Sequence, residues 1–162
     1  SGGGSAAPPP TRSGALGELG GMPDGPDVVL PSGVHVRRTS VGGRRVSEAA
    51  LLQAVRGIQQ LPVQHQLLIA RAGIAVELVP VAQLEQVEGT SQPVLGATAV
   101  NQDSSGRWIP SRIRIAVDSP ISARGGVNAI GEVTQHEIGH AIAVMGTEDR
   151  SEAAAIRYAA SY

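Results

Sequence analysis

Residues 136–140 read His136-Glu137-Ile138-Gly139-His140, an H-E-x-x-H motif within a proline-free run from Val127 to Met145. Residues four apart on a helix lie almost one above the other, so His136 and His140 can direct both imidazoles at one metal ion. Neutral histidine nitrogens suit a tetrahedral Zn²⁺, and Glu137 can reach a metal-bound water as the general base. The apolar flanks predict a buried helix over about residues 128–145, stopped by Gly146, in which these polar groups need a partner.

A third protein ligand is expected, because catalytic zinc sites normally have three protein ligands and a water. The acidic candidates after the motif are Glu148, Asp149 and Glu152. Glu152 is favoured, because it opens a final helix expected over residues 152–161, with Ser151 as the N-cap. A carboxylate in the first turn of a helix packed beside the metal helix could serve as the ligand. The alternative interpretation is that Glu152 binds no metal and only stabilises a helix N-terminus.

The short interval between His140 and Glu152 constrains this choice. A tight turn after Met145 would set Glu152 opposite the helix end, roughly 8 Å from His140 by the helix rise. The metal helix could therefore end early, the carboxylate could reach back, or Asp149 or Glu148 could substitute. The two remaining histidines, His35 and His65, lie on amphipathic segments, where a surface or packing role is favoured over ligation.

Composition limits the classes of partner. The chain has 162 residues, enough for one domain with a single core, and its net charge is −1. This charge gives no reason to expect nucleic acid or an acidic membrane surface as a partner, and no apolar run approaches the length of a membrane span. Cysteine is absent, which excludes disulfides and cysteine-ligated zinc.

All 13 basic side chains are arginine. A GC-rich genome is the favoured explanation, and a toxin or effector selected to lack lysine is the alternative.

The chain divides into two parts. Residues 1–26 are rich in Gly, Pro and Ser, and we expect a flexible linker or tag that tethers the rest to other domains. Residues 27–162 are expected to form a single domain.

Within residues 27–162, helical spacing predicts helices over 48–61, with Ser47 as the N-cap, and over 63–72, ending at Gly73. Residues 34–38 and 74–79 are expected to be strands, and residues 81–87 a short helix. Residues 94–100 and 109–117 flank a turn-rich loop and should pair as a hairpin. This order predicts an α+β fold with a small mixed sheet packed on helices.

The segment after the motif reads Glu152-x-x-Ala155-x-x-Tyr158. Together with the motif, it resembles the gluzincin metallopeptidases related to the anthrax lethal factor catalytic domain and the Pro-Pro endopeptidases, over roughly residues 34–162. The resemblance implies a zincin-like fold, zinc bound by His136, His140 and Glu152, and a water activated by Glu137. It also implies that an extended substrate pairs with the strand at residues 94–100. A second resemblance is to the ImmA/IrrE regulatory peptidases, which act on a repressor partner.

The sequence departs from the first family at one position. Met145 stands near the place where that family has an oxyanion-stabilising tyrosine. Candidates to replace the tyrosine are Tyr158, Tyr162, Arg157 and His65.

The expected function is therefore a zinc-dependent endopeptidase that acts on a protein or peptide, as an effector, a toxin or a processing module of a larger bacterial protein. The compartment is undetermined, and secretion or delivery as part of that larger protein is the working expectation. One alternative is a zinc-stabilised binding module without turnover, and another is a metal-free interaction domain.

Overall fold

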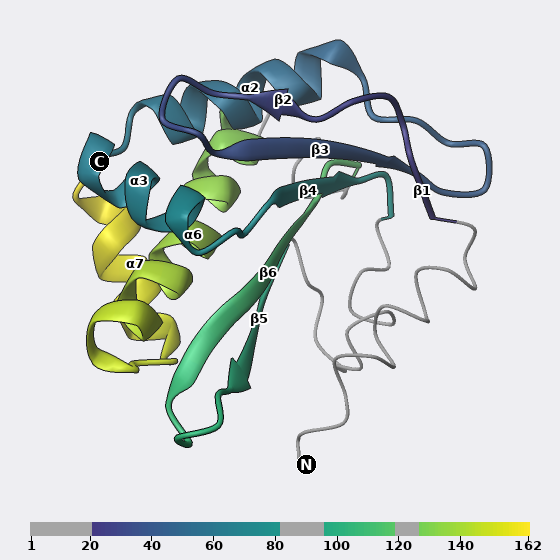
Figure 1. The fold of residues 1–162 in the computed structure, drawn as a ribbon. Coiled ribbons are helices and arrows are strands. Elements are labelled where there is room, and N and C mark those ends of the chain that lie inside the picture. The colour runs from purple at the N-terminus through teal and green to yellow at the C-terminus, as the bar shows by residue number, and fades with distance from the viewer. Residues whose placement is uncertain (1–20, 82–95, 119–126) are drawn as a thin grey trace.

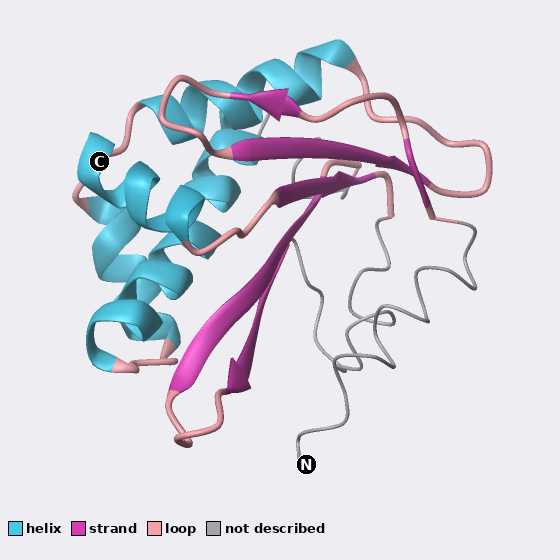
Figure 2. Cartoon of the chain, viewed as in Figure 1, coloured by secondary structure: helices cyan, strands magenta, loops and turns pink. Residues whose placement is uncertain are grey.

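The computed structural model describes residues 21–81, 96–118 and 127–162, and these form an α+β fold in which a small mixed sheet packs against helices. The strands are β1 (Met22–Pro23), β2 (Val28–Val29), β3 (His35–Ser40), β4 (Val76–Val79), β5 (Gly96–Gln102) and β6 (Trp108–Ala116). The helices are α2 (Glu48–Gln59), α3 (Val63–Arg71), α6 (Val127–Thr147) and α7 (Glu152–Ala160). Figure 2 shows the four helices gathered on one side of the sheet.

The sheet has the strand order β1-β3-β4-β6-β5, with β2 also paired to β3 (Figure 1). β3, β4 and β6 are parallel to one another, and the chain passes from β3 to β4 through α2 and α3. β5 runs antiparallel to β6, so the expected hairpin is confirmed. β5 therefore forms one end of the described sheet, next to α6.

Local sequence accounts for where the helices begin. The Ser47 hydroxyl accepts a hydrogen bond from the Ala50 N–H at 3.1 Å, and the Ser151 hydroxyl accepts one from the Ala154 N–H at 3.2 Å. Both residues are N-caps, as expected, and satisfy N–H groups that the helix itself leaves unpaired. Gly73, with a φ of 72°, follows the end of α3, which confirms its expected place there.

The end of α6 corrects one expectation. Gly146 does not stop the helix, because α6 continues to Thr147 and the backbone turns at Glu148, whose φ is 58°. The Glu148 N–H donates to the Val144 carbonyl at 2.9 Å, which closes the last turn in a left-handed cap. Non-glycine residues rarely adopt this conformation, so no local pattern predicts it at Glu148.

The apolar core lies between the helices and the sheet. Its fully buried members include Val36, Val76 and Ile113 from neighbouring strands, and Ile58 and Ile138 from α2 and α6. The helix α6 is thus packed on the sheet by the same segment that carries the H-E-x-x-H motif. Among the described residues, no helix has both the length and the apolarity needed to cross a bilayer.

α2 and α6 come very close at two glycines. A Cβ atom added to Gly57 would lie 2.8 Å from the carbonyl oxygen of Gly131 and 2.9 Å from its Cα. Two side chains could not fit at this crossing, so these glycines set how far α6 approaches α2.

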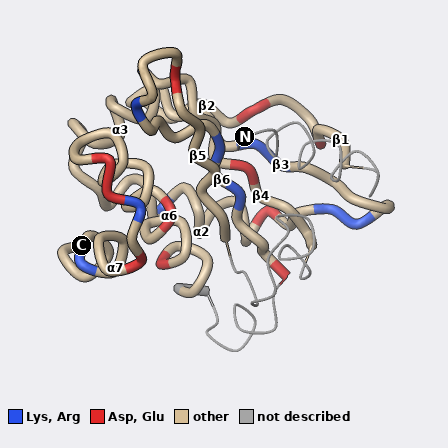
Figure 3. The backbone as a smooth tube through the Cα atoms, turned by 90° about the horizontal axis from the view of Figure 1, so that it is seen from below, with Lys and Arg blue, Asp and Glu red and all other residues tan. Residues whose placement is uncertain are grey.

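Charged residues lie side by side on β3, β4 and β6, since Arg37 pairs in register with Glu77 and Glu77 with Arg114; Figure 3 shows both signs of charge in this part of the sheet. Glu77 on β4 is buried and accepts hydrogen bonds from Arg112 Nε at 2.7 Å and Arg114 Nε at 3.4 Å, both from β6. Arg37 on β3 binds Asp27 through two hydrogen bonds of 3.0 Å. The bonds from Arg112 and Arg114 compensate the burial of Glu77 and link β4 to β6, and Arg37 Nη1 on β3 lies 4.0 Å from Glu77 Oε2.

Two expectations fall partly outside the described residues. Of the linker expected over residues 1–26, only residues 21–26 are described, and Met22–Pro23 pair with β3. Of the short helix expected over residues 81–87, only Val81 is described.

Candidate metal centre

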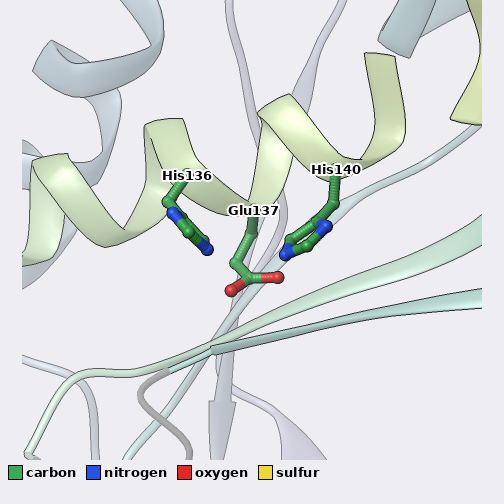
Figure 4. A group of neighbouring side chains, drawn as sticks. All are labelled: His136, Glu137 and His140. Carbon is green, nitrogen blue, oxygen red and sulfur yellow. The ribbon is translucent and has the colours of Figure 1, made fainter. Parts of the chain in front are cut away.

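The two motif histidines lie on one face of α6, as the four-residue spacing predicts. Their ring centroids are 5.0 Å apart, and the rings are nearly perpendicular. Figure 4 shows both rings and the Glu137 carboxylate projecting from the same side of the helix. Ligand atoms of His136, Glu137 and His140 all lie within 4.8 Å of one another. The motif thus forms a compact cluster of two imidazoles and a carboxylate.

Glu152, in the first turn of α7, brings a second carboxylate to the same place. Its Oε1 lies 2.6 Å from His140 Nε2, and its Oε2 lies 3.2 Å from His136 Nε2. Of the arrangements considered for the short interval, the observed one is that the carboxylate reaches back. α6 extends to Thr147, and the turn that follows directs α7 along the motif helix.

The other two acidic candidates bind elsewhere. Glu148 Oε1 accepts a hydrogen bond from the Trp108 N–H at 2.9 Å, at the tip of the β5–β6 hairpin. Asp149 Oδ1 accepts one from the Ser151 N–H at 2.9 Å, in the turn before α7. These bonds leave Glu152 as the acid that the structure brings to both histidines.

Glu137 lies in a different environment from Glu152, although both are in one cluster. Glu137 is 6% exposed, whereas the Glu152 side chain is 71% exposed. Burial raises the pKa of Glu137 above its ordinary value, and a hydrogen bond from Thr98 opposes this rise. Partial burial also acts to raise the pKa of Glu152, but hydrogen bonds with His140 and His136 outweigh it and leave that pKa below its ordinary value. Glu152 is therefore the more readily ionised of the two.

The edge strand β5 completes one wall of the cluster. The Thr98 hydroxyl lies 2.7 Å from Glu137 Oε1 and 2.9 Å from the main-chain oxygen of Glu137. Gly96 allows this approach, since a Cβ there would lie only 2.8 Å from Glu137 Cγ. The strand expected over residues 94–100 to pair with the substrate contains both residues, but their contact with Glu137 was not predicted, because strand-to-helix distances are not encoded in local spacing.

α7 is held against the motif helix by an aromatic contact. A Cβ on Gly139 would lie 2.9 Å from Tyr158 Cδ1, so the tyrosine packs directly on this glycine of the motif. The Tyr158 hydroxyl is 2.9 Å from His65 Nδ1 on α3, and burial raises the pKa of this phenol. The contact between Tyr158 and His65 thus links α7 to α3, and Tyr158 also packs on the motif at Gly139.

The remaining expected candidates are placed as follows. His35 is bonded to Asp27 at 3.0 Å, away from the motif histidines. Arg157 is largely exposed and lies 3.9 Å from Asp149, and Tyr162 stacks edge-on against His65. Within the described residues, neither His35 nor His65 forms a hydrogen bond with His136, Glu137 or His140.

The donor set fits a divalent transition metal. Two imidazole nitrogens and one carboxylate share a single location, and a His₂Glu set with one open position is a donor combination of catalytic zinc sites. The side chains of His136 and His140 are 24% and 14% exposed, so the location remains accessible from solvent. His136, His140 and Glu152 could therefore hold one metal ion, with Glu137 beside it.

Comparisons with protein-family models, curated proteins and solved structures found no match for this chain.

Proposed function

We propose that this chain is a zinc-dependent endopeptidase with a zincin-like fold, in which His136, His140 and Glu152 bind the zinc ion and Glu137 is the general base. The observation that carries the proposal is the position of the Glu152 carboxylate, 2.6 Å and 3.2 Å from the Nε2 atoms of His140 and His136. In this proposal Glu152, twelve residues after His140, is the third zinc ligand that the motif itself does not provide.

The chemistry follows from the neighbouring groups. A bound zinc ion would polarise the scissile carbonyl and acidify a water molecule. Glu137 accepts the proton of the attacking water and passes it to the departing amine. Its burial supports this role, because a carboxylate with a raised pKa is a stronger base toward the attacking water. Glu152, with its lowered pKa, remains an anionic ligand.

The proposed substrate is an extended protein or peptide segment. β5 pairs with β6 along one side and lies next to α6, with Thr98 in contact with Glu137. A peptide added to the other side of β5 would form main-chain hydrogen bonds beside the cluster, which is a common mode of peptide recognition. We also propose that this chain acts as an effector or as a processing module of a larger bacterial protein.

A zinc-stabilised binding module without turnover is the second candidate. It is favoured by the positions of the groups that could stabilise an oxyanion. Tyr158 and His65 are bonded to each other, and Arg157 lies beside Asp149. In the part of the chain that the structure describes, none of these three is bonded to His136, Glu137 or His140.

The test compares wild type with Glu137→Gln and Glu132→Gln in a peptide-library cleavage assay, with zinc measured in each protein. Glu132 is the matched control, because it is an exposed glutamate on the same helix, one and a half turns before Glu137. Wild type and Glu132→Gln should cleave the same sites. Glu137→Gln should keep its zinc and lose about 100-fold or more in rate, as expected for removal of a general base.

Two results would contradict the proposal. Cleavage by Glu137→Gln at the wild-type rate would remove Glu137 as the base. Zinc bound in all three proteins with no cleavage by any would leave the binding module as the function.

A further inference from the structure

Among the described residues, Thr98 is the one whose side chain forms a hydrogen bond with the Glu137 carboxylate. The hydroxyl has two acceptors on the same residue, Oε1 at 2.7 Å and the main-chain oxygen at 2.9 Å. A hydroxyl carries one proton, so it donates to one of these oxygens at a time. The contact with Oε1 is the shorter of the two, and donation to this oxygen fastens the Glu137 side chain to β5.

The backbone of β5 is positioned for this contact by Gly96. A Cβ at Gly96 would lie 2.8 Å from Glu137 Cγ, 3.1 Å from Val133 Cγ1 and 3.1 Å from the Arg114 carbonyl oxygen. Any larger residue would push β5 away from α6. Because Gly96 and Thr98 are two residues apart on a strand, they face the same side of the sheet. β5 therefore places a residue without a side chain beside Glu137 Cγ and, two residues later, a hydroxyl group beside the Glu137 carboxylate.

We propose that Thr98 is a positioning residue that holds the Glu137 carboxylate in the orientation required for proton transfer. This inference rests on the proposed function, in which Glu137 is the general base. It adds that the strand expected to pair with the substrate also orients the base. A carboxylate that rotates freely would be misplaced by an ångström or more, which is enough to slow a proton transfer substantially.

The competing explanation is that Thr98 contributes only packing and strand preference. Valine has the same shape and the same branching as threonine but lacks the hydroxyl, whereas serine keeps the hydroxyl and lacks the methyl group. Thr98→Val and Thr98→Ser therefore separate the two explanations. Ser111→Ala is the matched control, because its hydroxyl binds the Ala99 carbonyl at 3.2 Å within the same hairpin.

The experiment measures kcat, KM and zinc affinity for wild type and the three variants. Thr98→Val should lower kcat by about 10- to 100-fold, with KM and zinc affinity close to the wild-type values. Thr98→Ser and Ser111→Ala should keep kcat within a few-fold of wild type. A Thr98→Val protein with wild-type kcat would overturn the proposal, and so would a Thr98→Ser protein as slow as Thr98→Val. If Thr98→Val fails to fold, Thr98→Ala serves as the hydroxyl-free variant.

A structural readout keeps this inference separable from the proposed function. If the wild-type protein binds zinc but cleaves nothing, the proposed function fails, and crystal structures of wild type and Thr98→Val judge the contact instead. The inference predicts one Glu137 rotamer in wild type and a displaced or multiply placed carboxylate in the variant. An unchanged Glu137 rotamer without the hydroxyl would contradict it.

Discussion

Glu137 and Glu152 are two carboxylates in one cluster, and their surroundings shift their pKa values in opposite directions. Burial dominates at Glu137 and raises its pKa, whereas hydrogen bonds with His140 and His136 lower that of Glu152. Divergent pKa values in a pair of acids commonly separate a proton-transferring group from a permanently charged one. The residue-level environment therefore supports the roles proposed for the two acids.

The raised pKa of Glu137 implies a cost to the metal-free protein. In the unfolded chain this carboxyl group ionises near its ordinary value of 4.5, whereas in the folded protein it holds its proton to higher pH. The folded state thus binds more protons in this window, so stability falls as the pH rises through it. In the presence of EDTA, Glu137→Gln should melt at a higher temperature than wild type at pH 7, and the difference should shrink as the pH falls towards 4.5. Thermal melts over pH 4 to pH 8 check this, and equal melting temperatures at pH 7 would contradict it.

Glu152 and Asp149 allow a direct comparison of two neighbouring acids. Glu152→Gln removes a proposed ligand and should weaken zinc binding by at least about 100-fold, beyond the usual effect of losing an outer hydrogen-bond partner. Asp149→Asn alters the turn before α7, where Asp149 accepts from Ser151, and the ion pair of Asp149 with Arg157. Its zinc affinity should stay within about tenfold of wild type. Competitive titration with a zinc chelator measures both, and equal affinities would remove Glu152 from the ligand set.

At the scale of helices, the contact between α2 and α6 fixes where the motif sits. Gly57→Ala would place a Cβ 2.8 Å from the Gly131 carbonyl oxygen, and two backbones cannot yield as a side chain can. We expect a loss of about 1–3 kcal/mol in the free energy of unfolding. Gly146→Ala is the control, because nothing lies within 4 Å of its added Cβ. It should be neutral or stabilise the protein by up to about 1 kcal/mol, since alanine is the better helix former. Chemical denaturation measures both, and a neutral Gly57→Ala would contradict the packing argument.

The features that local sequence encodes were predicted well. The helix positions followed from periodicity and capping, and both Ser47 and Ser151 act as N-caps. The β5–β6 hairpin followed from two strand-like runs around a turn-rich loop. The convergence of His136 and His140 followed from helix geometry alone. These features depend on neighbours within a few residues, and such neighbours are visible in a sequence.

The features that depend on distant contacts could not be predicted. The hydrogen bond from Thr98 to Glu137 joins residues 39 positions apart, and the Gly57–Gly131 contact joins residues 74 positions apart. The position of Glu152 could be predicted only in part. Its helix was expected, but the choice among Glu148, Asp149 and Glu152 depended on the path of a short turn. That path is set by the left-handed conformation of Glu148 and its bond to the hairpin tip.

At the scale of the whole molecule, the cluster joins parts that are far apart in the chain. α6 supplies the histidines, α7 supplies Glu152, and β5 supplies the contact to Glu137. A metal that binds these residues only when they are assembled stabilises the folded state by mass action. Zinc at 100 times its dissociation constant adds about 2.7 kcal/mol. For a chain of this size, the melting temperature should rise by roughly 5–10 °C.

The comparison uses tag-free protein with EDTA and then with excess zinc. A variant with both His136→Ala and His140→Ala should show no rise. A wild-type melting temperature that does not respond to zinc would favour the metal-free interaction domain.

The most direct measurement of the zinc site is anomalous diffraction at the zinc edge from crystals of the tag-free protein grown with zinc. We expect one strong peak about 2.0–2.2 Å from the Nε2 atoms of His136 and His140 and from a Glu152 carboxylate oxygen. A map without a peak between these three residues, with zinc in excess, would contradict it.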